Sequence, residues 1–210
     1  MEKANKQPEG INQKETYQTI VQTAQRLFME LGYRAVSTRQ IADLCGITQP
    51  ALYHHFKNKQ TLYVEVIQHT LHQTEMDLNA ILSQYHPFQE RLYQIAIYMM
   101  VQFDVDMPQM FHDIFHELGN DDQQKIQMWW KKGFLMPVVK MIDDGLSEGE
   151  IRDPLLLNSD STELAYLILN IIKSILQPAT MSKMPVLEQK KIADNKAKLI
   201  VEILLNGISK

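Results

Sequence analysis

The spacing of apolar and polar positions predicts a chain built from helices. Apolar residues recur at intervals of three and four, and few stretches alternate as a strand would. We therefore expect an all-α protein, with a three-helix N-terminal head and a helical C-terminal body. Beyond the head, we place helices near residues 58–82, 88–104, 108–118, 121–144, 160–177 and 186–206. Pro137 lies inside one of these ranges and is expected to kink that helix.

The head is predicted to begin with a helix over residues 14–31. Its apolar positions fall on one helical face, and Gly32 follows as a terminator. We expect that face to be buried, and its members are Ile20, Ala24, Leu27, Phe28 and Leu31.

Two further short helices, joined by a glycine turn, are predicted between residues 37 and 59. Ser37 is a suitable N-cap for the first, with Gln40 three residues later as in a capping box. Gly46 stands where a helix commonly ends in a left-handed residue, and Thr48 is a suitable cap for the second helix. The small and apolar residues expected to pack the first helix are Ile41, Ala42, Leu44 and Cys45.

The second short helix has two contrasting faces. Leu52 and Phe56 are four residues apart and are expected to anchor it inward. Pro50 and His54 point the opposite way, with Tyr53 on the flank. Flat and polar groups on an outward face are typical of a helix placed in a DNA major groove. An unrelated helical hairpin is the alternative, since helix–glycine–helix units are common.

The side chains of this segment suit contacts to DNA. Gln49 can bond adenine through two hydrogen bonds, and the Pro50, Ala51 and Tyr53 side chains can touch thymine methyl groups. Arg39 is long enough for a guanine edge or a phosphate. Lys57 and Lys59 follow the helix and would contact the phosphate backbone, which positions a protein without distinguishing sequence.

Residues from about Thr16 to Ile67 resemble the DNA-binding domain of TetR-type bacterial transcriptional regulators. The residues that carry this resemblance are Ala24, Leu27, Phe28, Gly32, Tyr33, Thr38, Ile41, Ala42, Gly46, Ile47, Leu52, Tyr53, Phe56 and Lys59. The resemblance implies DNA contacts by Thr38, Arg39, Gln49, Pro50, Ala51, Tyr53, His54, His55 and Lys59. Cys45 departs from the pattern, because smaller residues are usual at that position.

Charge divides the chain in the same way as the motifs. Residues 1–62 hold eight Lys and Arg against five Asp and Glu, a net of +3, while residues 63–210 hold thirteen against twenty, a net of −7. We expect a flexible tail over 1–13, a DNA-binding domain over 14–62 and a regulatory and dimerisation domain over 63–210. The acidic part is not expected to lie on nucleic acid.

Two C-terminal helices carry wide apolar faces. These are formed by Leu164, Leu167, Ile168, Ile171, Ile172 and Ile175 in one helix, and by Ile192, Leu199, Ile200, Ile203 and Leu204 in the other. They suit either packing onto the body's own core or the four-helix interface between two copies that the resemblance implies. We expect a homodimer, because one helix-turn-helix contacts too few base pairs to be selective.

The middle of the chain is rich in methionine and aromatic residues, and the whole chain has twelve methionines. Such residues adapt to varied apolar ligands, although a filled helical core is the simpler explanation. The resemblance implies a small-molecule site here. The predicted lining residues are Phe103, Met107, Phe111, Phe115, Trp130 and Phe134. Nearby acidic residues would suit a cationic apolar ligand, or belong to a solvated face.

Other chemistry is weakly indicated. His112 and His116 share a helix face, but the intervening Asp113 replaces the glutamate of zinc proteases and no third ligand is evident. We expect no enzyme activity, metal or cofactor. Cys45 is the only cysteine, the polar N-terminus does not resemble a secretory signal, and no apolar run nears the roughly 20 residues of a membrane span. We therefore expect a cytoplasmic location.

Two functions follow from these features. The first is a repressor that a small apolar ligand releases from a palindromic operator. The second is a DNA-anchored module that binds a partner protein without a small-molecule inducer. A cavity of several hundred cubic ångströms among the body's helices would favour the first, and a tightly packed body the second.

Overall fold

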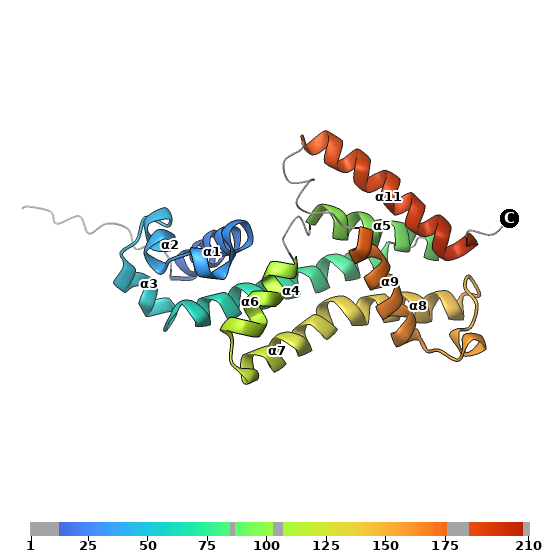
Figure 1. Ribbon diagram of the computed structural model, residues 1–210, viewed down its shortest axis with the longest axis horizontal. Helices are drawn as coiled ribbons and strands as arrows, with labels where there is room; N and C mark the ends of the chain where they lie inside the picture. The colour runs from blue at the N-terminus through green and yellow to red at the C-terminus, as the bar shows by residue number, and fades with distance from the viewer. Residues whose placement is uncertain (1–12, 85–86, 103–106, 176–184, 208–210) are drawn as a thin grey trace, which may run out of the picture. The chain divides into compact units, whose positions relative to one another are not determined.

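The computed structural model describes residues 13–84, 87–102, 107–175 and 185–207. Every regular element in these residues is a helix, which confirms the predicted all-α class (Figure 1). The chain forms two compact units that divide between residues 67 and 68, here called the head and the body. This division falls inside one helix. The predicted tail over 1–13 lies outside the described residues except for its last position.

The head contains α1 (Gln13–Ala35), α2 (Thr38–Leu44), α3 (Gln49–His55) and the first part of α4 (Lys59–Ser83). In α1 the backbone leaves helical geometry at Gly32, where φ is 78°, as expected of a terminating glycine. Asn58 caps α4, because its Oδ1 accepts a hydrogen bond from the Thr61 amide at 2.8 Å. The buried apolar residues of the head are Ile20, Val21, Ala24, Leu27, Phe28, Val36, Ile41, Ala42, Leu52, Phe56, Leu62, Tyr63, Val66 and Ile67.

Two apolar residues expected in this core are exposed instead, so those predictions were wrong. Leu31 lies in the last turn before Gly32, and Leu44 is the last residue of α2. Leu44 is 55% exposed, whereas Ile41 and Ala42 on the same short helix are buried. At about 100° per residue, Leu44 lies to one side of the stripe that Thr38, Ile41 and Ala42 form, so its side chain does not face the helices that this stripe packs against.

Tyr17 connects three elements of the head. Its ring stacks on Phe56, with centroids 5.1 Å apart, and its hydroxyl donates a hydrogen bond to Glu65 of α4. Burial raises the pKa of the Tyr17 hydroxyl, and the hydrogen bond to the Glu65 carboxylate raises it further. The neutral phenol is thus maintained as a donor between α1 and α4.

The body contains the rest of α4, followed by α5 (Phe88–Gln102), α6 (Met107–Glu117), α7 (Asn120–Trp130), α8 (Met136–Ser147), α9 (Ser161–Ile175) and α11 (Val186–Asn206). A 3-10 turn, Pro154–Leu157, precedes α9. Helix α11 runs alongside α5 (Figure 1). Ala193 and Ala197, one turn apart on α11, are both fully buried. Small side chains there let the α11 backbone approach its neighbours closely.

The predicted helix over 121–144 is observed in three parts. Between α7 and α8 the chain makes a π-helical turn, Lys131–Leu135, in which the Met136 amide donates to the Lys131 carbonyl. Pro137 follows and has no amide hydrogen to continue the usual bonding pattern. Gly133 in this turn is required for packing, since a Cβ there would lie 2.5 Å from the Leu71 carbonyl oxygen of α4.

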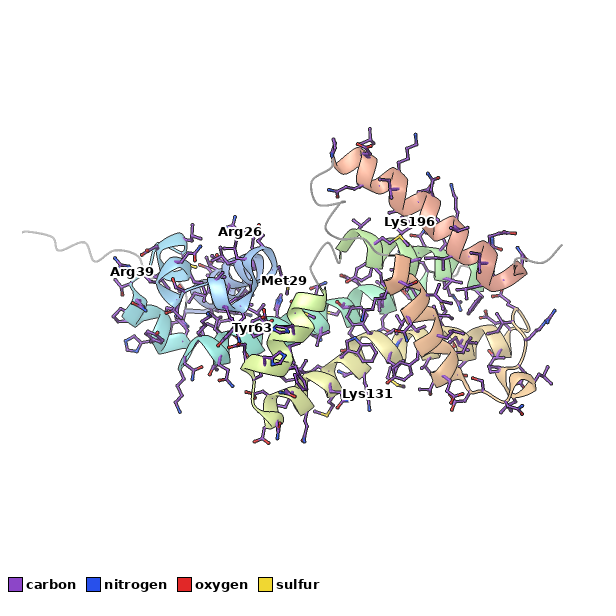
Figure 2. The ribbon with its side chains drawn as sticks, in the orientation of Figure 1. Arg26, Met29, Arg39, Tyr63, Lys131 and Lys196 are labelled. Carbon is purple, nitrogen blue, oxygen red and sulfur yellow. The ribbon has the colours of Figure 1, made fainter. Side chains whose placement is uncertain are left out.

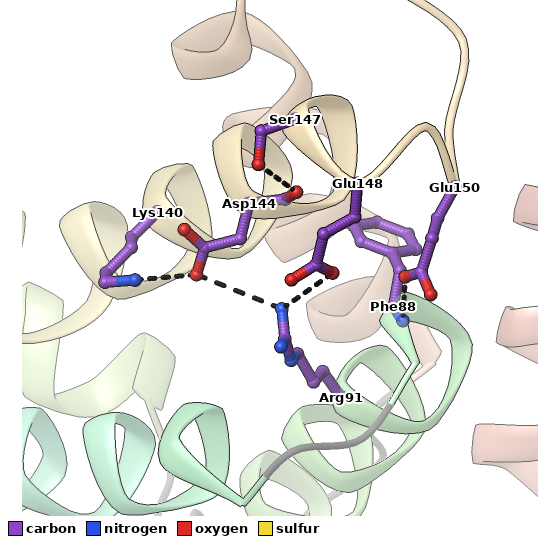
Figure 3. Close-up of polar contacts among 7 residues, drawn as sticks. All are labelled: Phe88, Arg91, Lys140, Asp144, Ser147, Glu148 and Glu150. Carbon is purple, nitrogen blue, oxygen red and sulfur yellow. Dashed lines mark hydrogen bonds and ion pairs between the residues drawn. The ribbon is translucent and has the colours of Figure 1, made fainter.

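Polar contacts join the start of α5 to the end of α8 (Figure 3). The buried Arg91 places its Nη1 3.7 Å from Glu148 Oε2 and 3.9 Å from Asp144 Oδ2. The Phe88 amide donates to Glu150 Oε2. Glycine at position 145 leaves room for the Phe88 ring, because a Cβ there would lie 2.8 Å from that ring.

In the described parts of the chain, no helix combines the length and apolar content that spanning a membrane requires.

Candidate nucleic-acid interface

The segment from α2 to α3 is held by local backbone contacts. Ser37 Oγ accepts the Gln40 amide at 3.1 Å, and Thr48 Oγ1 accepts the Ala51 amide at 3.3 Å, so both predicted caps are confirmed. Gly46 has φ 67°, in the left-handed region, as predicted. Ile47 then donates its amide to the Ala42 carbonyl at 3.0 Å. These contacts fix how α3 follows α2.

Helix α3 has the two faces that its sequence predicts. Leu52 and the following Phe56 are buried in the head. Pro50, Tyr53 and His54 are exposed, and Tyr53 retains 45% of its surface. A proline, a tyrosine and a histidine therefore face solvent along one side of a short, capped helix.

The other residues predicted to contact DNA occupy varied environments. Arg39 on α2 and Lys57 after α3 are exposed (Figure 2 labels Arg39). Gln49, Ala51 and His55 are half-buried, and His55 lies beside the rings of Tyr17 and Phe56.

Lys59 is half-buried, and its Nζ lies 4.2 Å from the centroid of the Tyr33 ring. A cation over an aromatic face is held in place by electrostatic attraction.

Thr38 differs from the rest because it is only 8% exposed. Its Oγ1 accepts a hydrogen bond from Gln49 Nε2 at 3.0 Å and lies 3.1 Å from the Tyr53 hydroxyl oxygen. One buried hydroxyl on α2 thus joins two side chains of α3. The sequence contained no signal for this connection, because it depends on how the two helices cross.

Cys45 is half-buried, with Sγ 3.8 Å from the Thr19 carbonyl oxygen of α1. The larger sulfur side chain is accommodated against α1.

The body has an open pocket of about 450 Å³ between α4, α5 and α11. It is lined by Ile81, Tyr93, Gln94, Ile97, Tyr98, Val101, Lys190 and Asp194. The Tyr93 hydroxyl donates a hydrogen bond to Asp194 Oδ1. The second carboxylate oxygen, Asp194 Oδ2, accepts a hydrogen bond from Lys198 Nζ at 2.9 Å. The hydrogen bond to Asp194, together with burial, raises the pKa of Tyr93 to about 12. The pocket thus combines apolar side chains with polar and charged groups, among them the two tyrosine hydroxyls.

Known proteins resemble this chain most strongly in the head and more weakly over the rest of its length. The family of "Bacterial regulatory proteins, tetR family" matches residues 20–66. An HTH-type transcriptional regulator of Staphylococcus aureus is 30% identical over 154 residues, which is 72% of this chain and 80% of that protein. The chain belongs to the TetR family of bacterial regulatory proteins. The Transposon Tn10 TetC protein of Escherichia coli is 50% identical over 62 residues, and this match spans only 30% of each chain.

Solved structures of other TetR-fold regulators cover nearly the whole chain. The transcriptional regulator FadR of Bacillus subtilis, in complex with stearoyl-CoA, has a TM-score of 0.70 and 20% identity, covering 92% of this chain and 100% of that one. AibR, in complex with isovaleryl coenzyme A and operator DNA, has a TM-score of 0.61 and 23% identity, covering 88% of this chain and 97% of that one. At these identities, the two structures establish the fold.

The six residues predicted to line a ligand site in this TetR-family chain are spread over different environments. Phe103 lies outside the described residues, as do the side chains of Met107 and Phe111. Trp130 stacks on Phe134, with centroids 6.3 Å apart, and Phe134 is buried. Phe115 is 71% exposed on α6. The pocket between α4, α5 and α11 is lined by two other members of the same aromatic-rich region, Tyr93 and Tyr98, and the six predicted residues stay a prediction.

The histidine pair of this regulator is exposed. The rings of His112 and His116 are 4.2 Å apart. Within the described ranges, no cluster of three or more His, Cys, Asp or Glu residues is arranged to hold a metal ion.

Proposed function

We propose that this transcriptional regulator is a homodimeric repressor that places α3 of each protomer in the major groove of a palindromic operator. One observation carries the proposal: α3 buries Leu52 and exposes Pro50, Tyr53 and His54. A helix that only completed a core would have no need of an exposed proline, tyrosine and histidine on one side.

Each side chain around α3 has a role within this proposal. Gln49, Pro50, Ala51 and Tyr53 contact base edges, and Arg39 contacts a guanine or a phosphate. Lys57 and Lys59 neutralise phosphates. The full set proposed at the DNA interface is Thr38, Arg39, Gln49, Pro50, Ala51, Tyr53, His54, His55, Lys57 and Lys59.

The proposed dimer forms through α9 and α11. Both helices bury one row of apolar residues within the protomer, yet Leu167 on α9 and Leu199 and Ile203 on α11 remain exposed. A second copy of these faces would bury them. In such a dimer the two α3 helices would bind half-sites about 34–36 Å apart, or a multiple of that spacing.

The proposed effector is a small molecule with an apolar body, bound in the pocket between α4, α5 and α11. A volume of about 450 Å³ lies within the roughly 300–1,000 Å³ usual for ligand sites. FadR and AibR, with the same fold, are in complex with acyl-CoA molecules. Helix α4 supplies Glu65 to the head and Ile81 to the pocket, and we propose it as the element through which ligand acts. The response is limited by the ligand's difference in affinity for the two states.

The test begins with selection of bound duplexes from a random DNA pool by the full-length protein. We expect an enriched palindrome, and binding to it that stearoyl-CoA or isovaleryl-CoA weakens in a titration. Ile97→Trp, which fills the pocket, should abolish the effect of ligand and retain DNA binding. A reporter promoter that carries the palindrome should be silenced by the protein, and activation would contradict the repressor assignment.

The alternative, a DNA-anchored module for a partner protein, predicts an enriched palindrome without any effect of ligand. An Ile97→Trp variant that still responded to the acyl-CoA would place the ligand elsewhere in the body.

A further inference from the structure

The hydroxyl of Thr38 occupies an unusual position beneath the proposed DNA-contacting surface. Thr38 is the first residue of α2, is 8% exposed, and has two side-chain partners, both on α3. Gln49 and Tyr53, its partners, are four residues apart and therefore lie on the same side of α3. A single oxygen atom thus restrains both side chains.

The direction of these hydrogen bonds follows from their chemistry. Gln49 Nε2 carries hydrogens and no acceptor, so Thr38 Oγ1 is the acceptor at 3.0 Å. The second bond, over 3.1 Å between Thr38 Oγ1 and the Tyr53 hydroxyl, uses a proton from either oxygen. Thr38 Oγ1 has the lone pairs and the proton to satisfy both arrangements at once.

This arrangement fixes which groups of Gln49 remain available. One Nε2 hydrogen points to Thr38, which leaves the second Nε2 hydrogen and Oε1 for other partners. Adenine presents an acceptor at N7 and a donor at N6 in the major groove, and these are the complements of those two groups. The bond to Thr38 therefore sets the plane of the Gln49 amide before DNA arrives.

We infer that Thr38 is a positioning residue that sets the base preference of this regulator by holding Gln49 and Tyr53 in place from beneath. The inference rests on the proposed placement of α3 in the major groove. It assigns Thr38 a different role from the lysines that neutralise phosphates: loss of the hydroxyl should reduce discrimination between sequences more than general affinity for DNA.

The test compares Thr38→Val, which keeps the shape and removes the hydroxyl, with Thr38→Ser, which keeps the hydroxyl. Affinities are measured for the selected duplex and for duplexes with single base-pair changes, over a range of salt concentrations. For Thr38→Val we expect a roughly tenfold loss of discrimination at the base pair contacted by Gln49, since the bidentate contact of the Gln49 amide is then no longer held in place. The slope of affinity against salt should be unchanged, and Thr38→Ser should behave as the wild type.

A double-variant control and the salt dependence separate positioning from a direct or a purely structural role. In a Gln49→Ala background, Thr38→Val should no longer alter preference at that base pair. Equal weakening of every duplex with a shallower salt slope would show a phosphate contact instead and overturn the inference. Unchanged discrimination in Thr38→Val would also overturn it.

A measurement on the wild-type protein covers the case in which Thr38→Val does not fold. In the free protein, the side-chain amide of Gln49 should have a high NMR order parameter, whereas the exposed Gln68 on α4 should give a low value. Equally low values for both would overturn the inference. Failure of the proposed function would look different, since the wild-type protein would then select no duplex sequence at all.

Discussion

The head and the body build their candidate sites in opposite ways. In the head, the residues proposed to contact DNA come from one continuous stretch between Thr38 and Lys59. In the body, the pocket is assembled from helices α4, α5 and α11, and its lining runs from Ile81 to Asp194. The head surface therefore depends on caps and turns within a few residues, whereas the pocket depends on how distant helices pack.

This difference predicts where substitutions act. A change in the head should act through the local geometry of α2 and α3, and should affect DNA binding with little effect on ligand binding. A change in the body should act through the spacing of its helices.

Leu52→Ala should cause the largest loss of stability. Leu52 is fully buried on the inner face of α3. Removal of a buried leucine side chain lowers the free energy of unfolding by about 2–5 kcal/mol, through lost burial and a remaining cavity. Leu44→Ala is the matched control, because Leu44 is mostly exposed, and should change stability by less than about 0.5 kcal/mol. Urea unfolding followed by circular dichroism measures both. Similar losses for the two leucines would contradict the assignment of the faces.

Gly133→Ala should destabilise the body by about 1–3 kcal/mol, since the added methyl group meets the Leu71 carbonyl oxygen. The exposed Lys131→Ala in the same π-helical turn serves as the control and should have little effect. The measurement is thermal unfolding, combined with affinity for the selected duplex. If Gly133→Ala left stability unchanged, the close approach of α4 to this turn would be wrong.

Thr48→Ala should weaken the head by about 1 kcal/mol, because the Ala51 amide loses its side-chain acceptor. Thr48→Ser keeps that acceptor and should retain most of the stability. Both variants are compared by urea unfolding. An equal loss in both would show that the Thr48 methyl group, and not the cap, stabilises α3.

The smallest expected effect concerns the Tyr98 hydroxyl, and it changes stability only at alkaline pH. Burial, together with a hydrogen bond to Asp77, raises the pKa of Tyr98 from 10.0 to about 12, although its contact with Thr74 acts in the opposite direction. The unfolded chain thus loses this proton before the folded one does, so the stabilisation is complete below about pH 10 and falls as the pH rises towards 12. Tyr98→Phe should lose less stability than the wild type over that interval. An identical decline in both proteins, measured by urea unfolding at each pH, would contradict the assignment.

The head could be predicted closely because its signals are local. The caps at Ser37 and Thr48, the glycine turn and the inward position of Leu52 all follow from spacing within one turn of helix. The same reasoning failed for Leu44, which lies to one side of the buried stripe formed by Thr38, Ile41 and Ala42. It also missed the contact of Thr38 with Gln49, which depends on the crossing of two helices.

The elements of the body were predicted well, whereas its pocket depends on helix packing that the sequence does not show. The last helix was expected over 186–206 and is observed with those bounds. The predicted lining residues, from Phe103 to Phe134, stay a prediction, and the pocket between α4, α5 and α11 is lined by Tyr93 and Tyr98 of the same aromatic-rich region together with Lys190 and Asp194 of α11. Nothing in the sequence places these residues opposite Tyr93, because the pairing of α5 with α11 is decided by tertiary packing. The π-helical turn before Pro137 could not be predicted from the sequence either, since Pro137 alone predicted only a kink.

The two buried alanines of α11 have a consequence for how this protein could acquire a new effector. A methyl group has no alternative rotamers, so Ala193 and Ala197 fix the distance between α11 and the helices that it packs against beside the pocket. A bulkier residue at either position would act as a spacer and push the helix outward. A laboratory evolution experiment that selects for response to larger inducers should therefore accumulate changes at these two sites as well as on the pocket wall.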